Sequence, residues 1–192
     1  MDNTILDEEI LQITEVLLTA TPEPLTKARF NQCLERNDVS LDTVIDALRR
    51  RFEDQDRPVQ IAFVAGGYQL VTMSEFQPYI QRLFQKAGRI SLTRAALETI
   101  AVVAYRQPVT KTEVDQIRGV NSDSTLKTLL ERELITIAGR EDTVGRPLLY
   151  GTTQQFLQAF GLGNLGDMPK LKEIREIMGE AEEPTPVVHE TE

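Results

Sequence analysis

The chain has 192 residues and a net charge of −9, from 21 Lys and Arg against 30 Asp and Glu. This length fits one large domain or two small ones, and 41% hydrophobic with 27% charged residues excludes wholesale disorder. The acidic balance argues against strong sequence-independent DNA binding, and a single cysteine excludes an internal disulfide and a four-cysteine zinc site.

The first half of the chain has the elements of a small domain. Apolar residues recur with the period of a helix over positions 10–18, which predicts a first helix there. Cys33 lies on a second predicted helix, where it is expected to be a small buried hydrophobe. A third helix ends at Arg49-Arg50-Arg51. These arginines are expected to interact favourably with the dipole at the helix C-terminus, and binding of nucleic-acid phosphate is the weaker interpretation. Val59–Val64 and Tyr68–Thr72 are predicted strands of a hairpin with a tight turn.

The second half predicts the same order of elements. Ser91 is expected to cap a helix that runs to about position 105. Thr110-Lys-Thr-Glu113 is typical of a capping box, and Gly119 is expected to end the helix that this box opens. Asn121 or Ser122 then caps a third helix.

A second hairpin follows these helices. Leu134–Ala138 and Leu148–Thr152 are predicted strands, joined by a polar loop that carries turn residues. Ser74-Glu-Phe-Gln77 after the first hairpin and Thr152-Thr-Gln-Gln155 in the second half are both typical of helix starts.

The two halves are also related in sequence. Ala20–Lys27 aligns with Ala104–Lys111 at an offset of 84, and Tyr68–Phe76 parallels Leu148–Phe156 at an offset of 80. A duplicated unit of this length is too long for a solenoid repeat. Three helices followed by a hairpin is the order of a winged helix, in which the second and third helices form a helix-turn-helix.

The sequence therefore predicts a mostly helical α+β fold of two tandem winged-helix domains. We expect the first at residues 1–86 and the second at 91–168, with a linker at Gln85–Ile90 and a largely disordered acidic tail at 169–192. Because such small domains bury a modest share of their surface, pairing between the units or dimerisation is expected.

Charge and residue types weigh against a DNA-reading surface. Residues 86–166 carry a balance of +2, and both flanking blocks are acidic. The third helix of the second unit begins with Asp123, and only Asn121 beside it is a base-reading type. In the second hairpin loop, Arg140 and Arg146 are offset by two acidic neighbours. A helix-turn-helix scaffold used to bind protein is the favoured interpretation, and a winged-helix transcription regulator is the alternative.

No catalytic, cofactor or metal site is predicted. Gly161-Leu-Gly163-Asn-Leu-Gly166 matches a dinucleotide-binding pattern, but a helix rather than a strand precedes it, so a helix end and loop is expected. The only histidine, His189, lies in the acidic tail. The acidic N-terminal segment does not read as a secretory signal and no apolar run reaches membrane length, so we expect a cytoplasmic protein.

One apolar segment extends beyond the second unit. Leu165, Met168, Leu171, Ile174 and Ile177 recur at near-helical spacing. The segment is expected either to pack back on the second unit or to bind a partner.

Several stretches together resemble one protein family. They are Ala65–Leu70, Ala96–Pro108, Ile117–Asp123, Leu129–Arg132 and Gly145–Thr153, within a resemblance that runs from about Ile10 to Leu171. The sequence is similar to bacterial segregation and condensation protein B, ScpB.

The resemblance implies a non-enzymatic subunit without cofactors. Its expected partners are a second copy, through the first domain, and the kleisin ScpA, mainly through the second domain. Contact with the SMC ATPase would pass through the kleisin, in a nucleoid-associated complex for chromosome condensation and segregation during cell division. Within the matching stretches, Arg118, Asn121 and Arg146 are the candidate partner-binding residues, because polar side chains gather at the turn and the wing.

Overall fold

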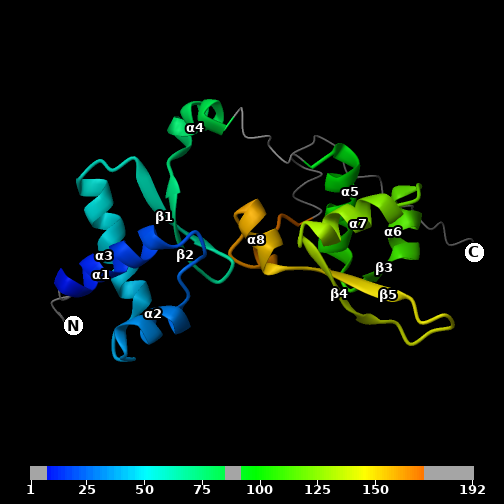
Figure 1. Ribbon diagram of the computed structural model, residues 1–192, viewed down its shortest axis with the longest axis horizontal. Coiled ribbons are helices and arrows are strands. Elements are labelled where there is room, and N and C mark those ends of the chain that lie inside the picture. Colours follow the sequence, from blue (N-terminus) through cyan, green and yellow to red (C-terminus); the bar gives the residue numbers. More distant parts are fainter. Residues whose placement is uncertain (1–7, 85–91, 171–192) are drawn as a thin grey trace, which may run out of the picture.

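The computed structural model describes residues 8–84 and 92–170, which form two units of helices and small antiparallel sheets (Figure 1). The first unit contains α1 (Glu8–Ala20), α2 (Lys27–Leu34), α3 (Leu41–Asp54), β1 (Val59–Val64), β2 (Gly67–Thr72), η1 (Ser74–Phe76) and α4 (Gln77–Phe84). The second contains α5 (Arg94–Arg106), β3 (Val109–Thr110), α6 (Lys111–Arg118), α7 (Asp123–Glu131), β4 (Ile135–Arg140), β5 (Leu148–Thr152), α8 (Gln154–Phe160) and η2 (Leu165–Asp167). The α+β fold class is confirmed.

Some predicted features lie outside the described residues. These are the linker Gln85–Ile90 and all but the first two residues of the acidic tail. Of the apolar segment after the second unit, the structure describes Leu165, which is exposed, and Met168, which packs against the second core.

Each copy of the repeat encloses its own cluster of buried apolar side chains. The first cluster contains Ile10, Leu11, Leu18, Leu25, Phe30, Leu41, Val44, Ile45, Leu48, Phe52 and Ile61. The second contains Ala96, Ile100, Val103, Ala104, Val109, Val114, Leu126, Leu129, Leu134, Ile135, Tyr150, Phe156 and Leu157. Burial of these side chains is the main favourable term that holds each set of helices to its hairpin.

Helix starts follow the predicted chemistry, with shifts of a residue or two. The capping box of Thr110 and Glu113 is confirmed. The predicted cap at Ser91 is wrong, because the Thr93 hydroxyl accepts the Ala96 N–H at 3.2 Å and α5 begins after it. The predicted helix start at 152–155 is confirmed, and Thr153 is the cap of α8. Each side-chain cap contributes about 1 kcal/mol.

One further prediction in the first unit is confirmed and another is wrong. The stretch 74–77 opens a helix, through a 3-10 turn at Ser74–Phe76 that leads directly into α4. Cys33 is exposed rather than buried. In α2 only Phe30 is buried, and Cys33 lies off the buried face of this short helix.

The hairpins share one pairing that the sequence pattern did not reveal. In the second unit β3 pairs with β5, Val109 opposite Tyr150, so the sheet has the order β3-β5-β4. In the first unit Leu25 makes the equivalent bridge to Tyr68. Each bridge residue directly follows a proline of the aligned segments. One or two paired residues are too few to give a periodic signal.

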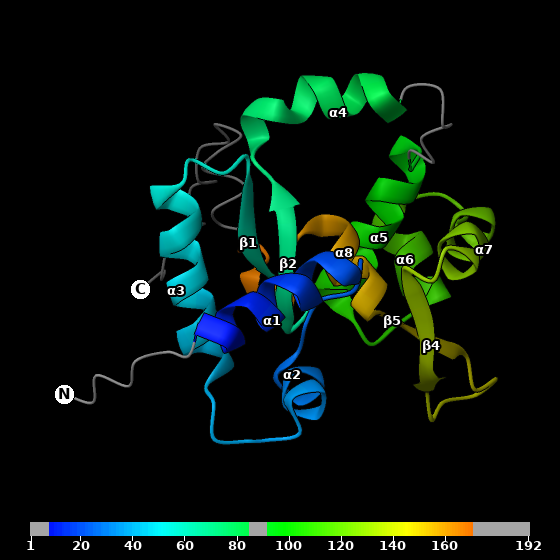
Figure 2. The same cartoon turned by 60° about the vertical axis from the view of Figure 1, so that its left-hand side comes forward.

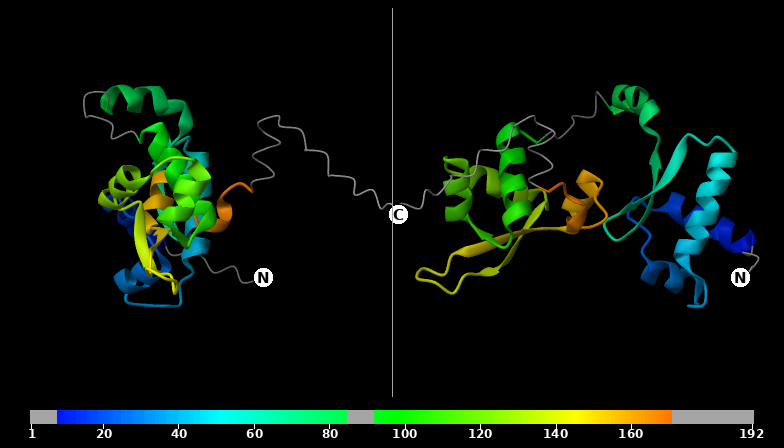
Figure 3. Two further views of the ribbon diagram at one scale, coloured as in Figure 1. Left: turned by 90° about the vertical axis from the view of Figure 1, so that its right-hand side faces the viewer. Right: turned by 180° about the vertical axis from the view of Figure 1, so that it is seen from behind.

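The two units touch through the first hairpin, as Figures 1 and 3 show. Ala65 N–H donates to the Leu162 carbonyl at 2.8 Å, and Gly66 N–H donates to the Gly163 carbonyl at 2.9 Å. Pairing between the units, one of the two expected arrangements, is therefore present. Helix α4 lies apart from α1–α3 in two views (Figures 1 and 2).

Candidate functional site

Arg118, the last residue of α6, lies inside the turn between α6 and α7. Its side chain is only 6% exposed. The guanidinium donates to the Ser122 hydroxyl at 3.0 Å and lies 3.5 Å from the Glu98 carboxylate on α5. Its Nε is buried and has no hydrogen-bond partner among the described residues. Arg118 therefore supports the turn from within and offers little surface to a partner.

A second set of charges fixes the same turn. The Asp115 carboxylate accepts the backbone N–H of Ser122 at 2.7 Å, and Lys111 lies 3.0 Å from Asp115 and 3.1 Å from Asp123. These hydrogen bonds raise the pKa of Lys111. Burial raises the pKa of Asp115, but the hydrogen bonds from Lys111 and Ser122 outweigh it, so this pKa lies below its usual value.

Asn121 is exposed at the start of α7. Its Oδ1 accepts the Asp123 N–H at 2.9 Å and its Nδ2 donates to the Asp123 carboxylate at 3.1 Å. The side chain thus forms a local turn of its own. The outer face of Asn121 remains open beside a shallow hollow that α6 and the turn also line.

Two exposed apolar residues belong to the end of α6 and the turn, and Val120 of these lines the hollow. Ile117 is 52% exposed and Val120 is 54% exposed. We call Ile117, Val120 and Asn121 the turn surface. The sequence does not single out this apolar pair. Ile117 is three residues after the buried Val114, and helical spacing places both on one face, so the pattern suggests that Ile117 is buried too.

Arg146 lies in a different place, near the tip of the β4–β5 hairpin. Its backbone has a positive φ of 42°, its N–H donates to the Thr143 carbonyl at 2.9 Å, and its carbonyl accepts the Arg140 guanidinium at 3.0 Å. Its side chain is exposed. The hairpin extends away from α6 and α7 (Figure 1). The structure therefore brings Arg118 and Asn121 together in one turn and leaves Arg146 on the wing.

The arginine triplet of α3 is largely engaged within the first unit. Arg49 donates to the Ile61 carbonyl at 2.9 and 3.1 Å and lies over the Tyr68 ring. Arg51, in the last turn of α3, pairs with Glu8 at 2.6 Å. Within this triplet Arg50 is exposed, and Arg49 and Arg51 are half-buried. Little of this positive charge is available for phosphate.

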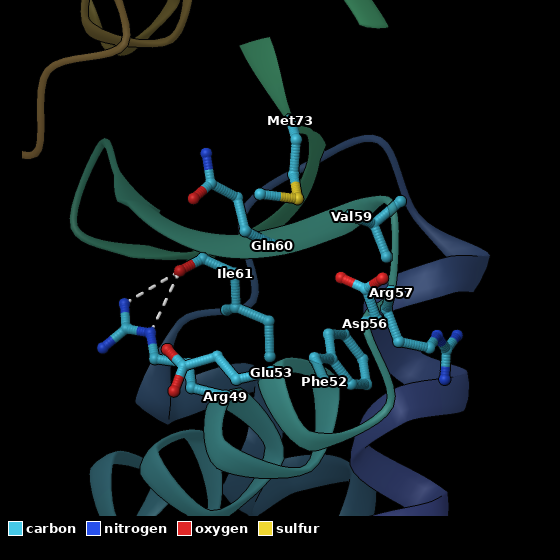
Figure 4. A pocket seen from close by; sticks show the side chains of 9 residues that line it. All are labelled: Arg49, Phe52, Glu53, Asp56, Arg57, Val59, Gln60, Ile61 and Met73. Carbon is cyan, nitrogen blue, oxygen red and sulfur yellow. Dashed lines mark hydrogen bonds between the residues drawn. The ribbon is translucent and has the colours of Figure 1, made fainter. Parts of the chain in front are cut away.

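A cavity of about 370 Å³ lies beside the triplet, between the end of α3, β1 and Met73 (Figure 4). Its two arginines are already paired. Arg49 binds the Ile61 carbonyl, and Arg57 lies 2.8 Å from Glu15 and over the Phe52 ring. Both arginines that line the cavity therefore already have partners within the first unit, and neither is free to bind a ligand.

The glycine-rich segment has the predicted form of a helix end and loop. Gly161 ends α8 in the left-handed conformation, and a 3-10 turn follows. Among residues 8–84 and 92–170, no group of His, Cys, Asp and Glu could hold a metal ion. Every helix in these ranges is too short or too polar to span a bilayer.

The chain is similar to proteins of one family over most of its length. The family model of segregation and condensation complex subunit ScpB matches residues 12–171. Segregation and condensation protein B of Clostridium tetani is 40% identical over 178 residues, which cover 91% of this chain and 94% of that relative.

Solved structures show the same sequence similarity. ScpB from Mycobacterium tuberculosis is 35% identical and covers 82% of this chain and 98% of its own, with a TM-score of 0.39. A dimer of an ScpB N-terminal domain complexed with an ScpA peptide is 27% identical and covers 40% of this chain and 95% of its own, with a TM-score of 0.36. Since these TM-scores are low, the assignment rests on the sequence match, and by that match the chain belongs to the segregation and condensation complex subunit ScpB family.

Proposed function

We propose that this chain is a non-enzymatic subunit of an SMC–kleisin complex, and that it binds the kleisin ScpA as a homodimer. The observation that carries this proposal is the family match over residues 12–171. It implies a role in chromosome condensation and segregation during cell division, in a complex at the nucleoid of the cytoplasm. In this proposal the first domain (1–86) dimerises and the second (91–168) binds the kleisin.

The turn surface is our proposed kleisin contact in the second domain. Ile117 and Val120 supply apolar area, and Asn121 supplies an exposed amide beside it. Exposed apolar residues bordered by polar groups are typical of protein-binding sites. Arg146 on the wing is proposed as a separate, polar contact. Arg118 has a positioning role in this proposal, because its side chain is buried beneath the turn.

A DNA-binding regulator is the weaker alternative. A winged helix that reads DNA needs basic side chains on its third helix and wing. The first turn of α7 carries Asp123, and Lys111 is paired with two carboxylates beside it. In a DNA complex, the region that would face the bases therefore holds an acidic residue and a lysine that is already paired with carboxylates.

Calorimetric titration with ScpA from the same genome tests the proposal. We expect binding near or below about 1 μM, with two copies of this chain per kleisin, and weak binding of duplex DNA at about 150 mM salt. Absence of ScpA binding by folded protein would overturn the proposal, and tight DNA binding would favour the regulator.

Surface variants then locate the contact. Val120→Asp and Asn121→Ala should weaken ScpA binding without loss of fold, and Arg146→Ala should weaken it less. Lys127→Ala is the matched control, because Lys127 is an exposed side chain on α7 outside the turn surface. Unchanged affinity in all three variants would remove the turn surface and the wing from the proposed interface.

A further inference from the structure

The glycine-rich segment after α8 is occupied by the first hairpin. Ala65 and Gly66 at the hairpin tip donate backbone hydrogen bonds of 2.8 and 2.9 Å to Leu162 and Gly163. We infer that this segment is a receptor for the hairpin tip, and that the contact holds the two units in one relative orientation. We call the contact of Phe63, Ala65 and Gly66 with Leu162 and Gly163 the clasp.

The receptor side of the clasp is anchored to the second unit at both ends. Leu162 N–H donates to the Leu157 carbonyl at 2.9 Å, which ties the segment to α8. Beyond the clasp, Tyr105 on α5 donates its hydroxyl to the Pro169 carbonyl at 2.7 Å. Between these anchors, Asn164 and Asp167 form a capping box. The two accepting carbonyls are therefore held in fixed positions.

The hairpin side is anchored to the first unit in a similar way. Tyr68 and Leu25 exchange two backbone hydrogen bonds, of 2.7 and 3.0 Å, beside the hairpin turn. The Phe63 ring makes an edge contact with Tyr68 at 5.3 Å between centroids. Ala65 and Gly66 have positive φ values of 49° and 77°, which form the tight turn that presents both N–H groups.

Packing adds to the hydrogen bonds across the clasp. Ala65 packs against the buried cluster of the second unit. A Cβ atom at Gly163 would lie 2.7 Å from Cδ1 of Phe63 and 2.8 Å from a carboxylate oxygen of Asp167. Such distances are too short for carbon, so a side chain at position 163 would displace the Phe63 ring or the Asp167 carboxylate.

The clasp gives the glycine pattern a structural explanation and has a mechanical consequence. Because each half is anchored to its own unit, the two hydrogen bonds and the packing of Phe63 and Ala65 against the second unit define an orientation. The position of the turn surface relative to the first unit is then set within the chain before any partner binds. Proteins that present a pre-organised surface lose less freedom on association.

Two variants of the full chain test the clasp from its two sides. Gly163→Val adds a side chain where Phe63 lies, and Phe63→Ala removes the ring without touching the receptor loop. In both variants we expect hydrogen exchange at the Ala65 and Gly66 amides to lose its protection. Gly139→Val is the matched control, because a Cβ there meets no atom within 4 Å.

A distance measurement reports the orientation itself. Spin labels on the exposed Cys33 and on a Lys127→Cys substitution mark one unit each. In labelled chains diluted with unlabelled chains, we expect a narrow distance distribution in the parent and broader ones in both variants. Unchanged protection and unchanged distributions in Phe63→Ala would overturn the proposal. A within-chain distribution that is broad already in the parent would overturn it in favour of a clasp between two copies.

Discussion

The two hairpins hold the same place in the repeat but have different surroundings. The first has a turn of two residues, and its tip lies against the second unit. The second has a longer loop from Glu141 to Pro147, and its Val144 is fully exposed. The short hairpin is thus engaged within the chain, and the tip of the longer one is exposed.

The helix turns of the two units differ as well. In the first unit Arg36 pairs with Asp38 on the surface, and this contact lowers the pKa of Asp38 to about 2. In the second unit the corresponding turn is built around the buried Arg118. One turn is held by solvent-exposed charges, and the other by a network that includes a buried side chain.

The largest expected effect is the loss of stability when a core side chain of one unit is removed. Phe30→Ala and Leu129→Ala each remove a fully buried side chain, one from each cluster. Each should lower the free energy of unfolding of its own unit by about 3 kcal/mol or more. Hydrogen exchange measured in both units should show faster opening mainly in the unit that carries the change. Equal acceleration in both units would mean that they unfold as one, and Val16→Ala, at an exposed site, is the control.

The second prediction compares the two turns. Arg118→Ala removes a buried guanidinium from Ser122 and Glu98 and should cost about 2 kcal/mol in urea unfolding. Arg36→Ala breaks an exposed ion pair, which is screened by solvent, and its effect should be much smaller. A comparable loss in both variants would contradict the proposed difference between the turns.

The smallest expected effect is a pH dependence of the second unit. Hydrogen bonds from the Thr110 backbone and hydroxyl lower the pKa of Glu113, and the pKa of Asp115 is also lowered. Groups with a lowered folded-state pKa stabilise the fold above their ordinary values of 4.5 and 3.8. This stabilisation is lost as the pH falls through the folded-state values.

An acid titration followed by circular dichroism checks this dependence. In the double variant Glu113→Gln with Asp115→Asn, the stability of the second unit should depend less on pH below about pH 4.5. Glu131→Gln is the control, because the Glu131 side chain is exposed and its carboxylate lies 3.9 Å from Lys127. An unchanged acid transition in the double variant would show that other carboxylates control it.

Local sequence chemistry predicted much of the fold. Thr110 with Glu113 and the stop at Gly119 were predicted correctly, because capping depends on residues three or four apart. The wrong cap at Ser91 has a second hydroxyl residue, Thr93, two positions later, and a pattern cannot choose between hydroxyl groups so close in sequence.

The missed features depend on distant parts of the chain. Exposure of Cys33 follows from how α2 lies on the core, which its own residues do not specify. Burial of Arg118 requires α5, and the contact of Gly163 with Phe63 joins residues of the two units that are far apart in sequence. Spacing within one segment does not predict contacts of this kind.

The anchoring of Leu162 and Gly163 behind α8 also bears on how the chain folds during synthesis. Domains form as units, with the N-terminal one first as the chain emerges from the ribosome. The hairpin tip at Ala65 is thus complete well before its acceptor carbonyls have been made. Until then its two N–H groups face water or another chain, so the nascent first unit passes through a period in which its hairpin is open to foreign contacts.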